Sequence, residues 1–265
     1  MAPHTFTEEL LATDPDAFRR ATQCEFLRAA ALGKMSKQVL GSWLANDRLY
    51  IHSYIKAIGR LLTILEVPQT VPETAAQAAA ERDPASIRLL DWIVAAMVNI
   101  RREEKFFVDV AQRFGIQVNL PTRADGTVDD AEKLDGLCQY EALFGSLEAG
   151  PGDRLPWLEG AVLFYATEKC YLEAWSWSKA QLVEQAPEQD ADGGALRTEF
   201  IDNWTCAEFV QFVKDLGSIV DQGIEEQVAA HGEGVRSELL ERGAKAWATV
   251  LAAEEKFWPE MPESS

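Results

Sequence analysis

The residues of this sequence best suited to chemistry are acids that lie on otherwise apolar helical stretches. The clearest case is Glu168, within the segment PWLEGAVLFYATEKCYLEAWSWSKAQLV at residues 156–183. Aromatic residues share its stripe at helical spacing, namely Tyr165, Tyr171 and Trp175. Burial of a lone charged carboxylate is costly, so such an acid acquires a raised pKa or a polar partner. It can then transfer protons in catalysis, or it can belong to a structural ion pair.

Two further acids occupy comparable positions. Asp47 lies on the apolar face of a long helical stretch, with Tyr50 and Tyr54 one and two turns further along the same side. Glu254 lies one turn before the Phe-Trp pair at 257–258, in an otherwise apolar neighbourhood. Both acids therefore repeat the pattern of a carboxylate in aromatic surroundings.

Together, these residues suit a pocket for a flat, nitrogen-rich ligand. Carboxylates accept hydrogen bonds from ring amines, and aromatic side chains stack on the ring. Tyr140 and Trp204 add aromatic candidates from two further helical stretches. Glu103 and Glu104, which lie between apolar turns, could either face water or contribute to a site, and we favour a solvated face. Each candidate is also compatible with a structural role, and periodicity alone does not show that the acids converge.

The sequence offers little for metal, haem or phosphate chemistry. Its histidines are far apart, and no Glu-x-x-His pair supplies a di-iron site. The cysteines are isolated singles without a CxxC motif, so reduced thiols are expected. No G-x-x-x-x-G-K, G-x-G-x-x-G or G-x-S-x-G motif is present. We therefore expect no metal and no cofactor.

Composition narrows the class of protein further. The chain has 265 residues, of which 47% are hydrophobic, enough for one large domain with a substantial core. With 25 basic and 43 acidic residues its net charge is −18, so nucleic acid is an unfavourable partner. The longest strongly apolar run, 92–98, is too short to cross a bilayer, and the N-terminus lacks a secretory pattern. We expect a cytoplasmic protein without membrane contact.

Helices must position the candidate residues, since no segment shows the alternation typical of a strand. The apolar periodicity, caps and breakers predict helices at 14–33, 36–66, 87–115, 130–149, 156–183, 196–230 and 234–258. An alanine-rich helical segment precedes Asp83, and polar connections are expected at 67–74, 116–130 and 188–194, the last as a mobile turn. The predicted fold is an all-α, compact multi-helix bundle forming a single domain over 1–265, with residues 1–13 and 259–265 as flexible or peripheral ends.

Three blocks of this chain resemble the TenA family, and the resemblance runs from about Thr22 to Met261. The block WLANDRLY at 43–50 is similar to the family's W-L-x-x-D-x-x-Y helix. FYATEKCYLEAW at 164–175 is similar to the pattern F-W-A-x-E-x-x-Y-x-E-x-[FW], and EEKFW at 254–258 to the C-terminal E-x-x-F-W. The resemblance implies a haem-oxygenase-like all-α fold.

The resemblance also implies roles for single residues. Asp47 matches the family's pyrimidine-binding aspartate, and Glu254 its second active-site glutamate. Glu168 matches the branch that carries glutamate where the other branch has a catalytic cysteine. Cys170 lies about 200° around the helix from Glu168 and should point elsewhere, which argues against thiamin cleavage. The resemblance and the aromatic pattern together place five residues in the pocket wall: Tyr50, Tyr140, Tyr165, Tyr171 and Trp204.

The activity implied by the resemblance is hydrolysis in thiamin salvage. The substrate would be 4-amino-5-aminomethyl-2-methylpyrimidine, which is deaminated, or its N-formyl form, which is deformylated. Asp47 would bind the pyrimidine, Glu168 would transfer protons, and Glu254 would position the acid and the substrate. One alternative is a non-catalytic member of the same fold that binds a small heterocycle or a protein. Another is a haem or quinone-cofactor enzyme. A homodimer or homotetramer is expected from relatives, and the sequence does not select the preferred pyrimidine.

Overall fold

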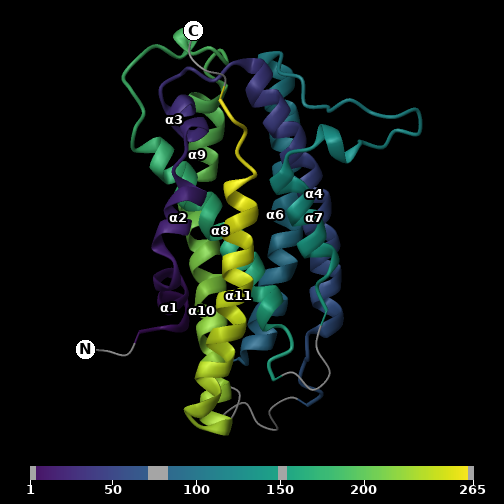
Figure 1. The fold of residues 1–265 in the computed structure, drawn as a ribbon, viewed down its shortest axis with the longest axis vertical. Helices are drawn as coiled ribbons and strands as arrows, with labels where there is room; N and C mark the ends of the chain where they lie inside the picture. Colours follow the sequence, from purple (N-terminus) through teal and green to yellow (C-terminus); the bar gives the residue numbers. More distant parts are fainter. Residues whose placement is uncertain (1–3, 71–82, 149–153, 262–265) are drawn as a thin grey trace.

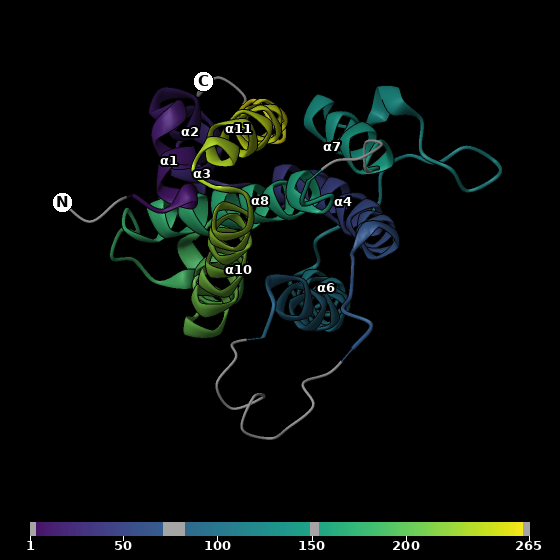
Figure 2. The ribbon, with the colours of Figure 1, turned by 90° about the horizontal axis from the view of Figure 1, so that it is seen from below.

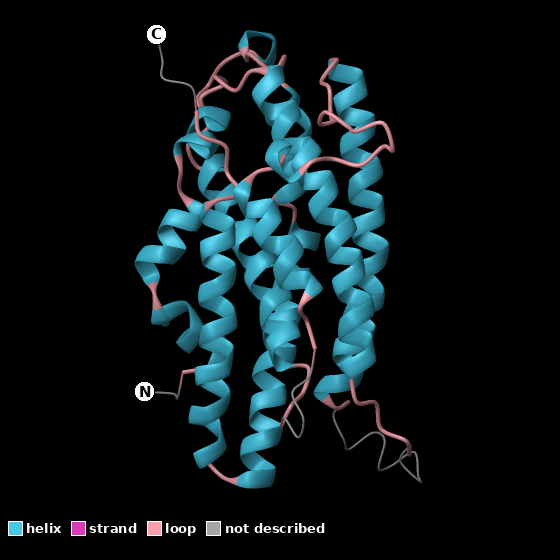
Figure 3. Ribbon diagram, turned by 45° about the vertical axis from the view of Figure 1, so that its right-hand side comes forward, coloured by secondary structure: helices cyan, strands magenta, loops and turns pink. Residues whose placement is uncertain are grey.

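The protein is built from α-helices, as a computed structural model shows. The structure describes residues 4–70, 83–148 and 154–261. Within these ranges there is no strand, only an isolated antiparallel bridge between Thr122 and Val128 (Figure 3). The predicted all-α bundle is therefore confirmed. No helix in the described ranges is long and apolar enough to span a membrane.

The helix that carries Glu168 lies at the centre of the bundle. This helix, α8, spans Leu158–Lys179, and much of its surface is buried along its whole length. Figure 2, viewed along the bundle, shows the other helices arranged around it. Its neighbours include α10 (Ala207–His231) and α11 (Gly234–Glu255). A helix that is buried on so many sides has apolar residues around most of its circumference. A carboxylate such as Glu168 is therefore unusual in its sequence.

Two long helices and a short one complete the other side of the bundle. They are α4 (Lys37–Ile64), α6 (Ala85–Phe114) and α7 (Asp135–Gly145), and α4 packs against both of the others (Figure 1). The ends follow the predicted signals, because Ser36 accepts a hydrogen bond from the Val39 amide and Gly115 adopts φ 66°. Helix α7 is shorter than the predicted 130–149, since a 3₁₀ turn at 130–132 precedes it.

The predicted helix at 14–33 is divided in two. Helices α2 (Pro15–Thr22) and α3 (Glu25–Ala31) are separated at Cys24, whose backbone is extended. The Trp258 indole nitrogen donates a hydrogen bond of 2.7 Å to the Ala21 carbonyl beside this break. A partner from the other end of the chain thus satisfies a carbonyl that a continuous helix would have bonded, which sequence periodicity does not reveal.

The predicted helix at 196–230 is also interrupted. A π-helical turn at Leu196–Phe200 runs into α9 (Ile201–Trp204), and α10 begins only after Cys206. Inserted π turns and breaks of this kind shift the direction of the side chains that follow. Here they bring the end of α9 to the wall of the candidate site described below.

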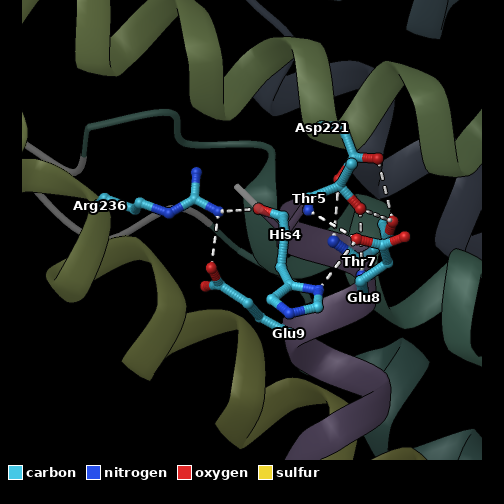
Figure 4. Close-up of polar contacts among 7 residues, drawn as sticks. All are labelled: His4, Thr5, Thr7, Glu8, Glu9, Asp221 and Arg236. Carbon is cyan, nitrogen blue, oxygen red and sulfur yellow. Dashed lines mark hydrogen bonds and ion pairs between the residues drawn. The ribbon is translucent and has the colours of Figure 1, made fainter. Parts of the chain in front are cut away.

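The N-terminal residues are anchored rather than peripheral, which corrects the prediction for 6–13. Helix α1 (Phe6–Thr13) buries the side chains of Phe6 and Leu10. The Thr7 amide and hydroxyl donate to the two oxygens of Asp221 on α10, at 2.8 and 2.9 Å (Figure 4). Trp258, which directly precedes the predicted C-terminal end at 259–265, is buried.

The polar connection at 188–194 is also held in place, contrary to the predicted mobile turn. Asp190 and Asp192 are buried, and Arg197 pairs with Asp190 at 2.7 Å. Asp192 accepts hydrogen bonds from the amides of Gly194 and Leu196, at 2.8 and 2.7 Å. The acids that suggested a solvated segment therefore hold it in place through buried hydrogen bonds and an ion pair. The predicted alanine-rich segment before Asp83 lies outside the described residues.

Candidate active site

A cavity of about 330 Å³ lies in the middle of the bundle, between α4, α6, α8, α10 and the end of α11. Its size falls in the range of small-molecule sites. The lining side chains that can ionise or hydrogen-bond are Asp47, Tyr50, Tyr54, Asn99, Arg102, Glu103, Thr167, Glu168, Tyr171, Asn203, Trp204, Cys206, Glu208 and Glu254. The three acids singled out from the sequence thus meet at one cavity, although they are separated by up to about two hundred residues.

Asp47 and Tyr50 enter the cavity from α4. Asp47 is buried, and its neighbour Asn46 helps to fix the helix by accepting a hydrogen bond of 2.9 Å from the Leu134 amide. Burial raises the pKa of Asp47 well above its ordinary value, and the negative charges of Glu103, Glu254 and Glu168 raise it further. This acid will favour a ligand that brings hydrogen-bond donors or positive charge.

Glu168 projects from the central helix and is paired with Tyr54. The Tyr54 hydroxyl donates a hydrogen bond of 2.6 Å to Glu168 Oε1. Burial raises the pKa of Glu168 to about 7, against the lowering effect of this hydrogen bond, and the Glu103 charge adds to the rise. Both protonation states of Glu168 are therefore populated near neutral pH, as an acid-base catalyst requires.

Glu254 is paired with Tyr140, whose hydroxyl donates a short hydrogen bond to Glu254 Oε2. Burial raises the pKa of Glu254 to about 8, against the lowering effect of the Tyr140 hydrogen bond. The other oxygen, Oε1, is buried without a hydrogen-bond partner in the described part of the chain. The residue itself is one of those that line the cavity.

A glycine makes the pairing of Tyr140 and Glu254 possible. The Gly136 amide donates to the Lys256 carbonyl at 3.1 Å, which ties the start of α7 to the end of α11. A Cβ at this position would lie 2.3 Å from the Phe257 nitrogen and 2.5 Å from the Ala253 carbonyl oxygen. Only glycine permits so close a backbone approach, and Tyr140 lies one turn further along α7.

Glu103 belongs to the site, which corrects its interpretation as part of a solvated face. Its carboxylate accepts hydrogen bonds from the Trp204 indole nitrogen at 2.6 Å and from the Asn203 amide at 2.9 Å. Glu104, by contrast, faces away and pairs with Arg101 and with His52. No sequence signal distinguished these adjacent acids except helical phase, since only one of two neighbours on a helix can share a given face.

The predicted aromatic residues divide between the cavity and its surroundings. Tyr50, Tyr171 and Trp204 line the cavity, whereas Tyr140 lies behind Glu254. Tyr165 is absent from the lining and packs instead toward Trp247, with ring centroids 6.1 Å apart. The reason is geometric, because Tyr165 and Tyr171 lie about 60° to either side of Glu168 on the helix, and one flank faces the cavity.

Two cysteines, Cys170 and Cys206, differ in their position relative to the cavity. Cys170 is buried, and it does not line the cavity, as expected from its position on α8. Cys206, at the start of α10, does line it, which the sequence did not indicate. In the described residues, the one group of acids and cysteines close enough to share a metal ion is Asp130, Cys138 and Glu141, outside this cavity.

Three comparisons with known proteins bear on the fold of this chain. A scan against protein-family models gives no match. A probable transcription factor of Fusarium pseudograminearum (strain CS3096) is 24% identical over 280 residues. That alignment covers 94% of this chain and 52% of the fungal protein, so the chain spans about half the length of that relative.

Two solved structures are similar over almost the whole chain. A TenA homologue from Pyrococcus furiosus superposes with a TM-score of 0.66 at 24% identity, covering 96% of this chain and 98% of the other. A TenA family transcription regulator from a Silicibacter species gives a TM-score of 0.62 at 17% identity, covering 96% and 94%. These likenesses confirm the all-α, haem-oxygenase-like fold.

Proposed function

We propose that this chain is a TenA-type hydrolase of the glutamate-bearing branch, acting on an aminopyrimidine of thiamin salvage or its N-formyl form. One observation carries the proposal: Asp47, Glu168 and Glu254 converge on a single cavity among aromatic side chains. Carboxylates with raised pKa values, in a cavity of this size, suit a small heterocycle that presents amino groups. The similarity to TenA structures supports the same assignment.

Asp47 and Glu254 bind the ring in this proposal. Asp47 accepts hydrogen bonds from the ring amino group, and Tyr50 and Tyr171 cover the faces of the pyrimidine. The unpartnered Oε1 of Glu254 accepts a further donor from the substrate, while Tyr140 holds the other oxygen. A donor from the substrate would satisfy this one buried oxygen, which is otherwise unpaired in the described residues, and so would stabilise the complex.

Glu168 carries the proton transfers. The aminomethyl group leaves as ammonia when the C–N bond of its ammonium form breaks. The Glu168 carboxylate removes a proton from water as the water oxygen bonds to the carbon, which leaves an alcohol, and the Glu168 acid then passes this proton to the departing ammonia. With the N-formyl substrate, the carboxylate activates water for attack on the formyl carbon and then protonates the amine, releasing formate. A pKa of about 7 supports both directions of transfer at neutral pH.

The test is turnover by a Glu168→Gln variant. General acid-base catalysis is typically worth about 10² to 10⁴ in rate, so kcat should fall by that factor while pyrimidine binding remains. Glu173→Gln is the matched control, because Glu173 lies on the same helix and pairs with Lys169 outside the cavity. Undiminished turnover in Glu168→Gln would remove this residue from the mechanism.

A second candidate is a non-catalytic domain that binds a heterocycle and signals its presence. It is favoured by the relatives described as a transcription factor and a transcription regulator. The net charge of −18 argues that such a domain would sense a ligand rather than contact DNA itself. Incubation with the aminomethyl- and formylaminopyrimidines separates the two candidates, since a raised Tm without product formation supports the sensor. Association into a homodimer or homotetramer remains a prediction, which sedimentation would test.

A further inference from the structure

Glu103 adds a further carboxylate to the cavity beside Asp47, Glu168 and Glu254, and the hydrogen bonds it accepts favour its charged form. Trp204 Nε1 and Asn203 Nδ2 are both donors that cannot accept, and together they engage both of its oxygens. Burial raises the pKa of Glu103 above its ordinary value, and the hydrogen bonds from Asn203 and Trp204 and the positive charge of Arg102, which also lines the cavity, act against that rise. Donors that satisfy a carboxylate so fully stabilise its anion.

This anion has no role in anchoring the neutral pyrimidine ring. Asp47 and Glu254 already supply acceptors for the ring and its amino group, and Glu168 serves proton transfer. Glu103 comes from α6, on the other wall of the cavity, and is near enough to Asp47 and Glu168 to raise the pKa of both. Glu103 is therefore an acceptor whose charge the proposed ring contacts do not need, whereas burial raises the pKa values of Asp47, Glu168 and Glu254 and favours their neutral forms.

We propose that Glu103 is a specificity-determining residue that selects a cationic aminomethyl substituent over a neutral formamide. The inference rests on the proposed function and resolves which of the two pyrimidines is preferred. An ammonium group gains a charge-assisted hydrogen bond to the Glu103 carboxylate, whereas a neutral formamide gains no such bond. The uncharged hydroxymethyl analogue should be disfavoured for the same reason.

Calorimetric binding tests this on the full chain with three ligands: the aminomethylpyrimidine, its N-formyl form and the hydroxymethyl analogue. A charge-assisted hydrogen bond is worth about tenfold to a hundredfold in affinity, so the amine should bind more tightly than either neutral ligand by that factor. Glu103→Gln keeps the shape of the side chain and removes the charge. It should abolish the preference by weakening amine binding alone.

Glu104→Gln is the matched control, because it alters the neighbouring acid, which faces Arg101 and His52. It should leave the preference intact. Similar affinities of the wild-type chain for the amine and the formamide would overturn the inference, while the proposed hydrolase function would still stand. This measurement uses the wild-type protein alone, so it does not depend on the folding of a variant. A preference that survives in Glu103→Gln, with an intact circular dichroism spectrum, would also overturn it. Failure of the wild-type chain to bind any of the three would overturn the proposed function itself.

Discussion

The buried acid Glu254 should make the stability of the unliganded protein fall as pH rises. Its pKa is about 8 in the folded chain and near 4.5 when exposed. Between these values the folded state holds a proton that the unfolded state has lost, so the stabilisation is complete below the lower value and disappears as pH passes the upper one. For this one group the change between pH 5 and pH 8 is about 3 to 4 kcal/mol.

Glu254→Gln removes this titration and retains an oxygen that can accept from Tyr140. The free energy of unfolding can be measured by urea titration, followed through tryptophan fluorescence, at pH 5, 6, 7 and 8. Asp47 and Glu168 titrate in the same direction, so the wild-type curve slopes for several reasons. The informative quantity is therefore the difference between variant and wild type, which should move in favour of the variant by about 3 to 4 kcal/mol across the range.

Glu255→Gln provides the control for this experiment. Glu255 is the next residue, is partly exposed, and pairs with Arg20 at 3.1 Å. Its difference from wild type should change by less than about 1 kcal/mol, as for other exposed ion pairs. A constant difference between Glu254→Gln and wild type from pH 5 to pH 8 would refute the reasoning, because Glu254 would then ionise alike in both states.

Two further predictions concern the partners of the site. Tyr54→Phe removes the hydrogen bond that lowers the pKa of Glu168. The part of the pH profile of kcat/KM that reports the ionisation of Glu168 should therefore shift to higher pH by about one unit. An unchanged profile would contradict this. Gly136→Ala should destabilise the fold by about 3 kcal/mol in chemical denaturation, because the added Cβ meets backbone atoms of α11. Gly145→Ala, on the same helix with open space around it, should have little effect, and equal losses in both would disprove the packing argument.

Helical phase explains why much of the site could be predicted from the sequence. An acid on an apolar stripe must point inward, and this was sufficient to select Asp47, Glu168 and Glu254. The same logic directed Cys170 away from Glu168. The long helices were predicted well where local caps define them, as at Ser36 and Gly115, because those signals act within one turn.

The remaining features depended on contacts between distant segments. The break at Cys24 accompanies a hydrogen bond from Trp258, and the polar segment 188–194 is ordered by an ion pair with Arg197. Such contacts join residues far apart in the chain, so local periodicity carries no trace of them. For this reason the predictions of a mobile turn, a peripheral N-terminus and unbroken helices were wrong.

The sequence by itself determined an all-α bundle and the acids that face its interior. Only the tertiary structure decided that those acids meet at one cavity, that Glu103 joins them, and that Tyr165 does not. The physical reason is that periodicity defines the direction of a side chain around its own helix, whereas a site is defined by the neighbouring helices that lie in that direction. The packing of side chains throughout the core determines which helices become neighbours.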